Sequence, residues 1–123
     1  MKPLTRLSWL VVPVLALCLV GCKGERKVDA TKPLEQSFQS AGPEVQQAIA
    51  TVNTCLKANN FADATKALVP VAQRPMTDPQ REAVGLALHQ INQAIAANPS
   101  LDTKEMYQLR AQIFQAVHNG PRL

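Results

Sequence analysis

The chain has 123 residues and a formal net charge of +4, from 13 Lys and Arg against 9 Asp and Glu. This length accommodates one small domain, and most of the charge precedes it, because residues 41–123 carry seven basic and six acidic side chains. Such a balance argues against nucleic acid as a partner, since a nucleic-acid-binding domain would show a basic stripe.

The chain begins with a short leader. Lys2 and Arg6 precede an apolar run over 9–20. A membrane-spanning helix needs roughly 18–20 apolar residues, and this run is only about a dozen long. We therefore predict that residues 1–21 are a signal peptide that is removed from the mature protein.

The run ends in Leu19 and Val20, and Gly21 and Cys22 come directly after it. They resemble the lipobox of bacterial lipoproteins at all four positions. The resemblance implies that Cys22 receives a diacylglyceryl group on its sulfur, becomes the mature N-terminus, and anchors the protein in a lipid bilayer. In the sorting rule of enteric bacteria, an aspartate directly after the lipidated cysteine keeps a lipoprotein in the inner membrane. Lys23 stands at this position, so the resemblance points to the outer membrane, facing the periplasm or the cell surface. An ordinary secretory signal that happens to end in cysteine is the alternative.

The three cysteines predict no disulfide. Cys18 leaves with the leader and Cys22 is used by the lipid, so Cys55 has no partner within the chain. A reactive thiol needs exposure and an electropositive neighbourhood. Because Cys55 lies beside an apolar stripe, we interpret it as a small core residue.

Residues 22–41 are polar, of mixed charge, and without clear periodicity, which predicts a lipidated N-terminus followed by a flexible tether. Leu34 and Phe38 stand four apart and could dock as one turn. The helical domain is expected over 42–123.

The first two helices are predicted from apolar side chains at helical spacing. One spans 43–57, with Pro43 in its first turn and the stripe Val45, Ile49, Val52 and Leu56. Asn60 is expected to cap the second, which places Phe61, Ala64, Leu68 and Val71 on one face. Pro70 should kink or end this helix on its solvent side.

Two further helices complete the prediction. The third begins at Thr77 with Gln80, or at Asp78 with Pro79, and stops at 98–99. The fourth begins at a capping box of Asp102 and Glu105 and ends at a glycine stop, 119–121. Their inward faces are Val84, Leu88, Ile91 and Ile95, and Met106, Leu109, Ile113, Ala116 and Val117.

These elements predict an all-α fold, a small bundle in which four amphipathic helices form two antiparallel hairpins. The turn 59–61, followed by Ala64 and Leu68, resembles the middle of a tetratricopeptide repeat over 48–71. The resemblance implies a tetratricopeptide-like shape.

The sequence predicts no catalytic, cofactor-binding or metal-binding residues and no enzymatic activity. No paired carboxylates, serine elbow or glycine-rich phosphate loop appears in the mature chain, and no further ligands stand near His89 or His118 at zinc-site spacing.

One surface on the fourth helix is the candidate site. Tyr107 and Phe114 are seven apart and lie beside the core stripe, with Arg110 between the two apolar strips. Either a partner protein covers this second strip, or the tether does so through Leu34 and Phe38. The sequence therefore predicts a membrane-anchored lipoprotein whose helical module binds an envelope protein. A self-associating structural or stress-related envelope lipoprotein is the alternative.

Overall fold

The computed structural model describes residues 27–123, and this part of the chain consists of helices joined by short connections, with one isolated bridge between Met76 and Arg122 and no strand. The elements in chain order are α2 (Thr31–Ser37), α3 (Pro43–Lys57), α4 (Phe61–Ala72), α5 (Asp78–Ala97), the 3-10 helix η2 (Pro99–Leu101) and α6 (Lys104–Asn119). The all-α prediction is thus confirmed for these residues, with one α-helix more than expected. The predicted signal peptide and the predicted lipidation site, Cys22, lie outside the described residues. Among the helices of 27–123, none has the length and apolar character needed to cross a bilayer.

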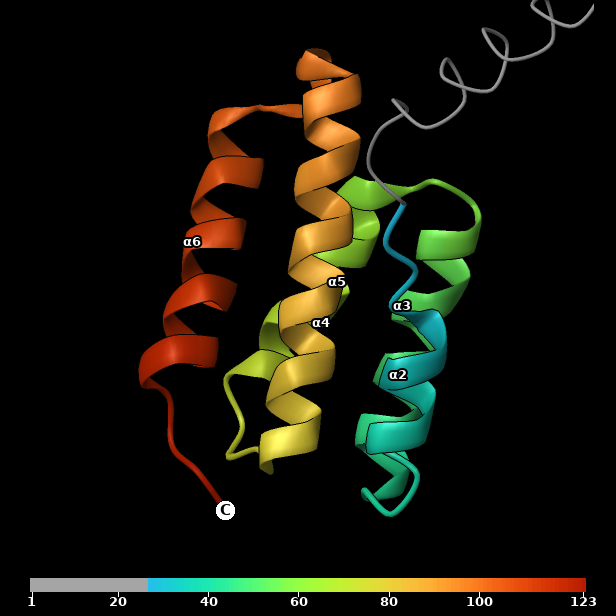
Figure 1. Ribbon diagram of the computed structural model, residues 1–123, viewed down its shortest axis with the longest axis vertical. Coiled ribbons are helices and arrows are strands. Elements are labelled where there is room, and N and C mark those ends of the chain that lie inside the picture. Colours follow the sequence, from blue (N-terminus) through green and yellow to red (C-terminus); the bar gives the residue numbers. More distant parts are fainter. Residues whose placement is uncertain (1–26) are drawn as a thin grey trace, which may run out of the picture.

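The helices form two layers (Figure 1). α2, α5 and α6 lie side by side in the front layer of this view, and α3 and α4 lie behind them. α5 contacts α2 on one side and α6 on the other, while α4 packs against α3, α5 and α6. The central pair α4 and α5 therefore joins the two layers.

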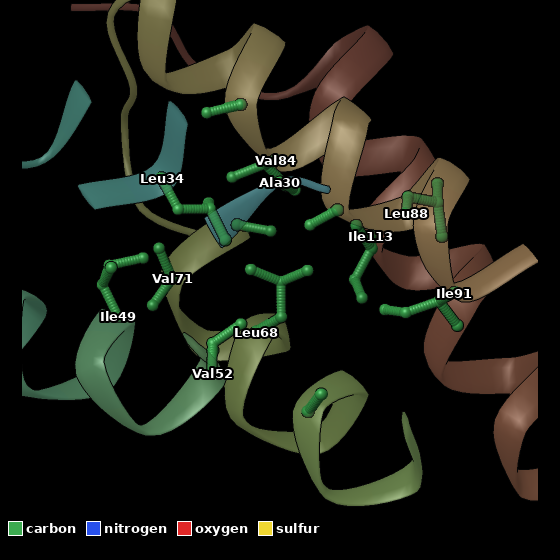
Figure 2. Packing of buried hydrophobic residues seen from close by; sticks show 14 of the residues in the cluster. Ala30, Leu34, Ile49, Val52, Leu68, Val71, Val84, Leu88, Ile91 and Ile113 are labelled. Atoms are coloured by element: carbon green, nitrogen blue, oxygen red, sulfur yellow. The ribbon is translucent and has the colours of Figure 1, made fainter. Parts of the chain in front are cut away.

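The core lies where the apolar stripes of all five helices meet (Figure 2). Leu34, Leu68, Ile91 and Ile113 come from four different helices and have no exposed surface. Burying a side chain of this size contributes about 1.5–3 kcal/mol. The predicted stripes of α3, α4 and α5 are buried, except for half-buried Phe61, and in α6 Leu109, Ala116 and Val117 are only half-buried.

The prediction of a flexible tether through residue 41 is wrong for α2. Ala30, Leu34 and Phe38 are at most 3 % exposed and belong to the core, so this segment is part of the domain. An isolated helix of this length is unstable in water, and tertiary contacts must supply its stability. The sequence suggested docking through Leu34 and Phe38 but not a helix that completes the core.

Side-chain amides from α3 and α5 hold the backbone of this segment. Such groups satisfy polar backbone atoms that have no partner at the ends of a helix. The contacts are Gln93 Oε1 with the Val28 N–H (2.9 Å), Gln90 Oε1 with the Ala30 N–H (2.9 Å), Asn53 Nδ2 with the Thr31 carbonyl (3.0 Å) and Gln80 Nε2 with the Ser37 carbonyl (3.2 Å).

The starts of α4 and α5 confirm their predicted caps. Asn60 Oδ1 accepts the Asp63 N–H at 3.3 Å, and Thr77 and Gln80 form a reciprocal capping box. Pro70 does not end α4, which continues to Ala72 with the exposed proline in its last turn.

The start of α6 corrects the predicted capping box. Thr103 is the cap, and its hydroxyl accepts the Met106 N–H at 3.1 Å. Asp102 instead ends η2 and pairs with Arg110, while Glu105 pairs with Lys66 at 3.2 Å. Both carboxylates therefore pair with basic side chains, and they do not form the predicted capping box.

The end of α6 depends on close packing. Gly120 follows the helix as predicted, but its φ of −74° is ordinary, so no left-handed turn requires the glycine. A Cβ at this position would lie 2.3 Å from the Ala116 carbonyl oxygen, which explains why glycine is needed there. Arg81 of α5 is buried and donates to the carbonyls of Ala116, Val117, Gly120 and Pro121. Its charge thus faces the negative end of the α6 dipole.

A candidate protein-binding groove between α5 and α6

Two large side chains on α6 remain in solvent. Tyr107 is 65 % exposed and Phe114 is 53 % exposed, while Met106 and Ile113, each one residue earlier, are buried. Residues seven apart lie on the same side of a helix. The two aromatic rings therefore form a second strip beside the buried one.

The described part of the predicted tether, residues 27–41, does not cover this strip. Leu34 and Phe38 are buried in the core, and α2 packs against α3 and α5. Because Tyr107 and Phe114 are still exposed with α2 docked, the alternative in which the tether covers them is wrong.

The strip borders a shallow groove of about 300 Å³ between α5 and α6. Ala111 stands between the two aromatic side chains and leaves a recess, because its side chain is a single methyl group. The groove is neutral in its lining except for Arg110, and it combines apolar surface with side-chain amides. Its lining residues are Leu88, Asn92, Tyr107, Arg110, Ala111, Phe114 and Gln115.

Arg110 contacts residues of both helices that line the groove. Its guanidinium donates to Asn92 Oδ1 at 2.9 Å and pairs with Asp102 Oδ1 at 2.7 Å, and its Cζ lies 6.0 Å from the centre of the Tyr107 ring. The side chain is 19 % exposed. A guanidinium over a tyrosine face at this distance is a cation–π contact. Arg110 therefore fixes Tyr107 and neutralises Asp102, so little net charge is left for a ligand.

His118 extends the strip by one turn. Its ring stacks on Phe114 with centroids 4.0 Å apart, and its Nδ1 lies 2.9 Å from the Phe114 carbonyl oxygen. The strip now has an alternating 4-3-4 spacing, which is typical of a helix face that packs along a second helix. Its members are Tyr107, Ala111, Phe114 and His118.

A wider hollow of about 470 Å³ lies between α2 and α3. Glu35 and Lys57 contribute opposite charges to its lining, together with several amides. Asn53 borders it, and its Oδ1 is buried without a hydrogen-bond partner. The lining lacks the exposed aromatic residues that distinguish the α5–α6 groove.

The remaining predicted positions lie apart from the groove. Cys55 is half-buried against the core, in agreement with its interpretation as a packing residue, and His89 is exposed on α5. No group of three or more His, Cys, Asp or Glu side chains within 27–123 is arranged to hold a metal ion.

Sequence reasoning identified Tyr107, Arg110 and Phe114 but missed the α5 wall of the groove. Leu88 was assigned to the core stripe alone, and Asn92 lies one turn further along α5. A pattern within α6 carries no information on which helix lies beside it.

Comparison of this chain with protein-family models, curated proteins and solved structures gives no match.

Proposed function

We propose that this protein is a lipid-anchored envelope protein whose helical domain binds an amphipathic helix of a partner protein in the α5–α6 groove. The observation that carries the binding proposal is the exposed, braced pair Tyr107 and Phe114 beside that groove. No residue set in the domain suggests catalysis, so the proposal is for a non-enzymatic module.

The anchor is proposed on the sequence of the leader. The lipobox-like residues 19–22 follow a basic start and an apolar run too short to span. One acyl chain gives only marginal membrane binding, whereas two or three hold a protein durably. Mass spectrometry of the protein isolated from its membrane tests this proposal. We expect Cys22 as the N-terminal residue with diacylglyceryl on sulfur, and loss of both lipid and membrane fractionation in Cys22→Ala.

The chemistry of the groove favours a helix as its occupant. The 4-3-4 spacing of the strip matches a helical seam, and the recess at Ala111 accepts one large apolar side chain. Since Arg110 is already paired with Asp102, the groove selects for apolar contact more than for charge. Asn92 and Gln115 at its edges offer hydrogen bonds to polar groups flanking the apolar face.

The finer architecture belongs to the same proposal. We infer that α3 with α4, and α5 with α6, act as two antiparallel hairpins of a tetratricopeptide-like module. Support comes from the packing of α3 on α4 and of α5 on α6 and from the short turns that join them. Modules of this shape commonly present helix surfaces to peptides.

A photo-crosslinking experiment in the native membrane tests the binding site. Benzoylphenylalanine replaces Gln115, at the edge of the groove, where it leaves the recess at Ala111 open, or Leu86, which is 40 % exposed on α5. We expect an adduct from position 115 that maps by mass spectrometry to an amphipathic helix of another protein. Tyr107→Ala with Phe114→Ala should remove this adduct, whereas Leu86→Ala should leave it.

A synthetic peptide of the mapped segment then gives the affinity. Each aromatic anchor that is buried on binding is expected to contribute about 2 kcal/mol, roughly a 30-fold change in Kd per residue. An adduct between two copies of this chain, with dimers in sedimentation, would establish the self-associating alternative. No adduct at position 115, or one that survives the double substitution, would refute the proposed groove.

A further inference from the structure

The chain from Cys22 joins the domain at one defined end. Gln93 and Gln90, in the second half of α5, bind the backbone of Val28 and Ala30. The opposite end of α2 is held by Gln80, in the first turn of α5. Residues 27–29 therefore lie toward the end of the bundle where α5 finishes, as Figure 1 shows.

Three segments form this end, which we call the tether end. They are residues 27–29, the α3–α4 turn at 58–60, and the α5–α6 connection at 98–103. The far end carries the α2–α3 turn, the α4–α5 turn and the C-terminus. About 20 Å separates the levels of Gln80 and Gln93, from 13 residues at 1.5 Å each along α5.

Few residues separate the predicted lipid from the domain. Only 23–27 lie between Cys22 and Val28. Even a fully extended chain of this length spans no more than about 20 Å. We propose that the tether end is a membrane-facing surface that rests against the lipid headgroups. This inference rests on the proposed anchor at Cys22.

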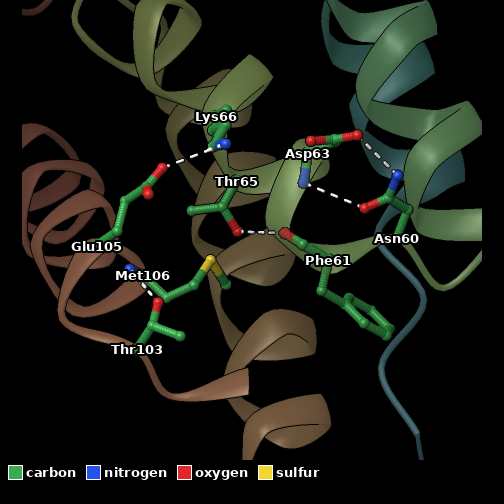
Figure 3. Close-up of polar contacts among 8 residues, drawn as sticks. All are labelled: Asn60, Phe61, Asp63, Thr65, Lys66, Thr103, Glu105 and Met106. Carbon is green, nitrogen blue, oxygen red and sulfur yellow. Dashed lines mark hydrogen bonds and ion pairs between the residues drawn. The ribbon is translucent and has the colours of Figure 1, made fainter. Parts of the chain in front are cut away.

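The charges at the tether end fit that surface. Of the acidic side chains in and beside the tether end, two are paired with cations, Glu105 with Lys66 (Figure 3) and Asp102 with Arg110. Asp63 and Asp29 accept hydrogen bonds from the neutral side chains of Asn60 and Thr31 and keep their negative charge. Lys27 and Lys104 take part in none of the ion pairs of residues 27–123. In the connection, Lys23 and Arg26 carry two positive charges and Glu25 one negative charge, which leaves residues 23–26 with a net charge of +1. Cations near an anionic leaflet are attracted to it.

The apolar residues in and directly beside the tether end are small or partly covered. Ala97 and Pro99 are exposed, while Phe61 and Leu101 are half-buried. The described part of the tether end thus offers no large exposed apolar side chain for insertion. Contact with headgroups, rather than entry into the hydrocarbon, follows from this composition.

Distance measurements on vesicles test the orientation separately from acylation in the cell. The mature chain, residues 22–123 with Cys55→Ala, is coupled through its Cys22 thiol to a maleimide lipid in phosphatidylcholine–phosphatidylglycerol vesicles. A fluorophore is attached to azidophenylalanine at Ser100, in the tether end, or at Ser40, in the far end, with an acceptor on the headgroups. Cys55→Ser provides a second background, in which the difference between the two labels should be the same.

We expect the label at position 100 to lie roughly 20 Å nearer the headgroups than the label at position 40, from the helix rise. Inserting a Gly-Ser linker of about twelve residues after Lys23 should reduce the difference, because such a linker adds a reach of roughly 20 Å. Equal distances, or a nearer label at position 40, would overturn the proposed orientation even where Cys22 proves to be acylated. An unacylated Cys22 in the cell would instead overturn the anchor, whatever the vesicles show.

Discussion

Leu34→Ala should detach α2 from the domain while the other helices stay folded. Leu34 has no exposed surface and packs into the core with Ala30 and Phe38. Truncating a fully buried leucine to alanine costs about 2–5 kcal/mol, from lost burial and the cavity left behind. A seven-residue helix has almost no intrinsic stability to set against that loss. The cost therefore falls mainly on the docking of this one segment.

Hydrogen exchange with mass spectrometry measures this directly. In Leu34→Ala we expect amides of 28–38 to exchange at least about 30-fold faster, which corresponds to 2 kcal/mol of local stability. Amides of α6 around Ile113 should keep their protection. Glu35→Ala is the matched control, because Glu35 lies on the same helix and is exposed. Unchanged exchange over 28–38 in Leu34→Ala, or an equal loss of protection in Glu35→Ala, would refute the conclusion that tertiary contacts of Leu34 stabilise α2.

Three further predictions concern the ends of the helices. Gly120→Ala should destabilise the domain by about 1–3 kcal/mol, seen as a lower Tm, because the new methyl meets the Ala116 carbonyl; an unchanged Tm would contradict that contact. Asn59, at φ 59°, ends α3 in the left-handed region, so Asn59→Ala should cost about 1 kcal/mol in urea unfolding while Asn59→Gly costs less. The hydroxyl of Thr31, then its N–H, lowers the pKa of Asp29. The carboxylate therefore stabilises the α2 region above a pH of about 4, the unfolded pKa, and the effect is lost as the pH falls through the lower folded value. Protection factors of the 28–31 amides, which compare each exchange rate with the intrinsic rate at the same pH, should fall on acidification in the parent chain, and Asp29→Asn should reduce that dependence.

The long helices could be predicted because each carries its own signal. In α3 and α5 four large apolar residues recur at spacings of three or four, which is enough to define a buried face from local sequence. α2 has only Ala30, Leu34 and Phe38 in such a register. That set fits a docked turn as well as a helix, and the deciding hydrogen bonds come from Gln80, Gln90, Gln93 and Asn53, far away in the sequence.

The errors at the polar positions have the same origin. Asp102 and Thr103 can both cap a helix, and the choice between them is made by Arg110, which takes the carboxylate. Arg81 stands three residues before Val84 on the core face, yet a basic residue there usually reaches out to water. The Arg81 side chain is buried because it donates hydrogen bonds to the carbonyls at the end of α6. The sequence of α5 alone does not predict that these carbonyls lie beside it.

The two proposals together restrict where a partner can be. α6 begins at the tether end and runs away from it over 16 residues, about 24 Å at 1.5 Å per residue. If the tether end faces the bilayer, Tyr107 lies nearer the headgroups than Phe114, and a helix seated along the groove stands away from the membrane surface. The connection spans at most about 20 Å and α6 adds about 24 Å, so the segment of the partner that binds along the groove lies within roughly 45 Å of the bilayer. A partner helix that crosslinks at position 115 but belongs to a segment held further from the membrane would be incompatible with one of the two proposals, and the vesicle distances would identify which.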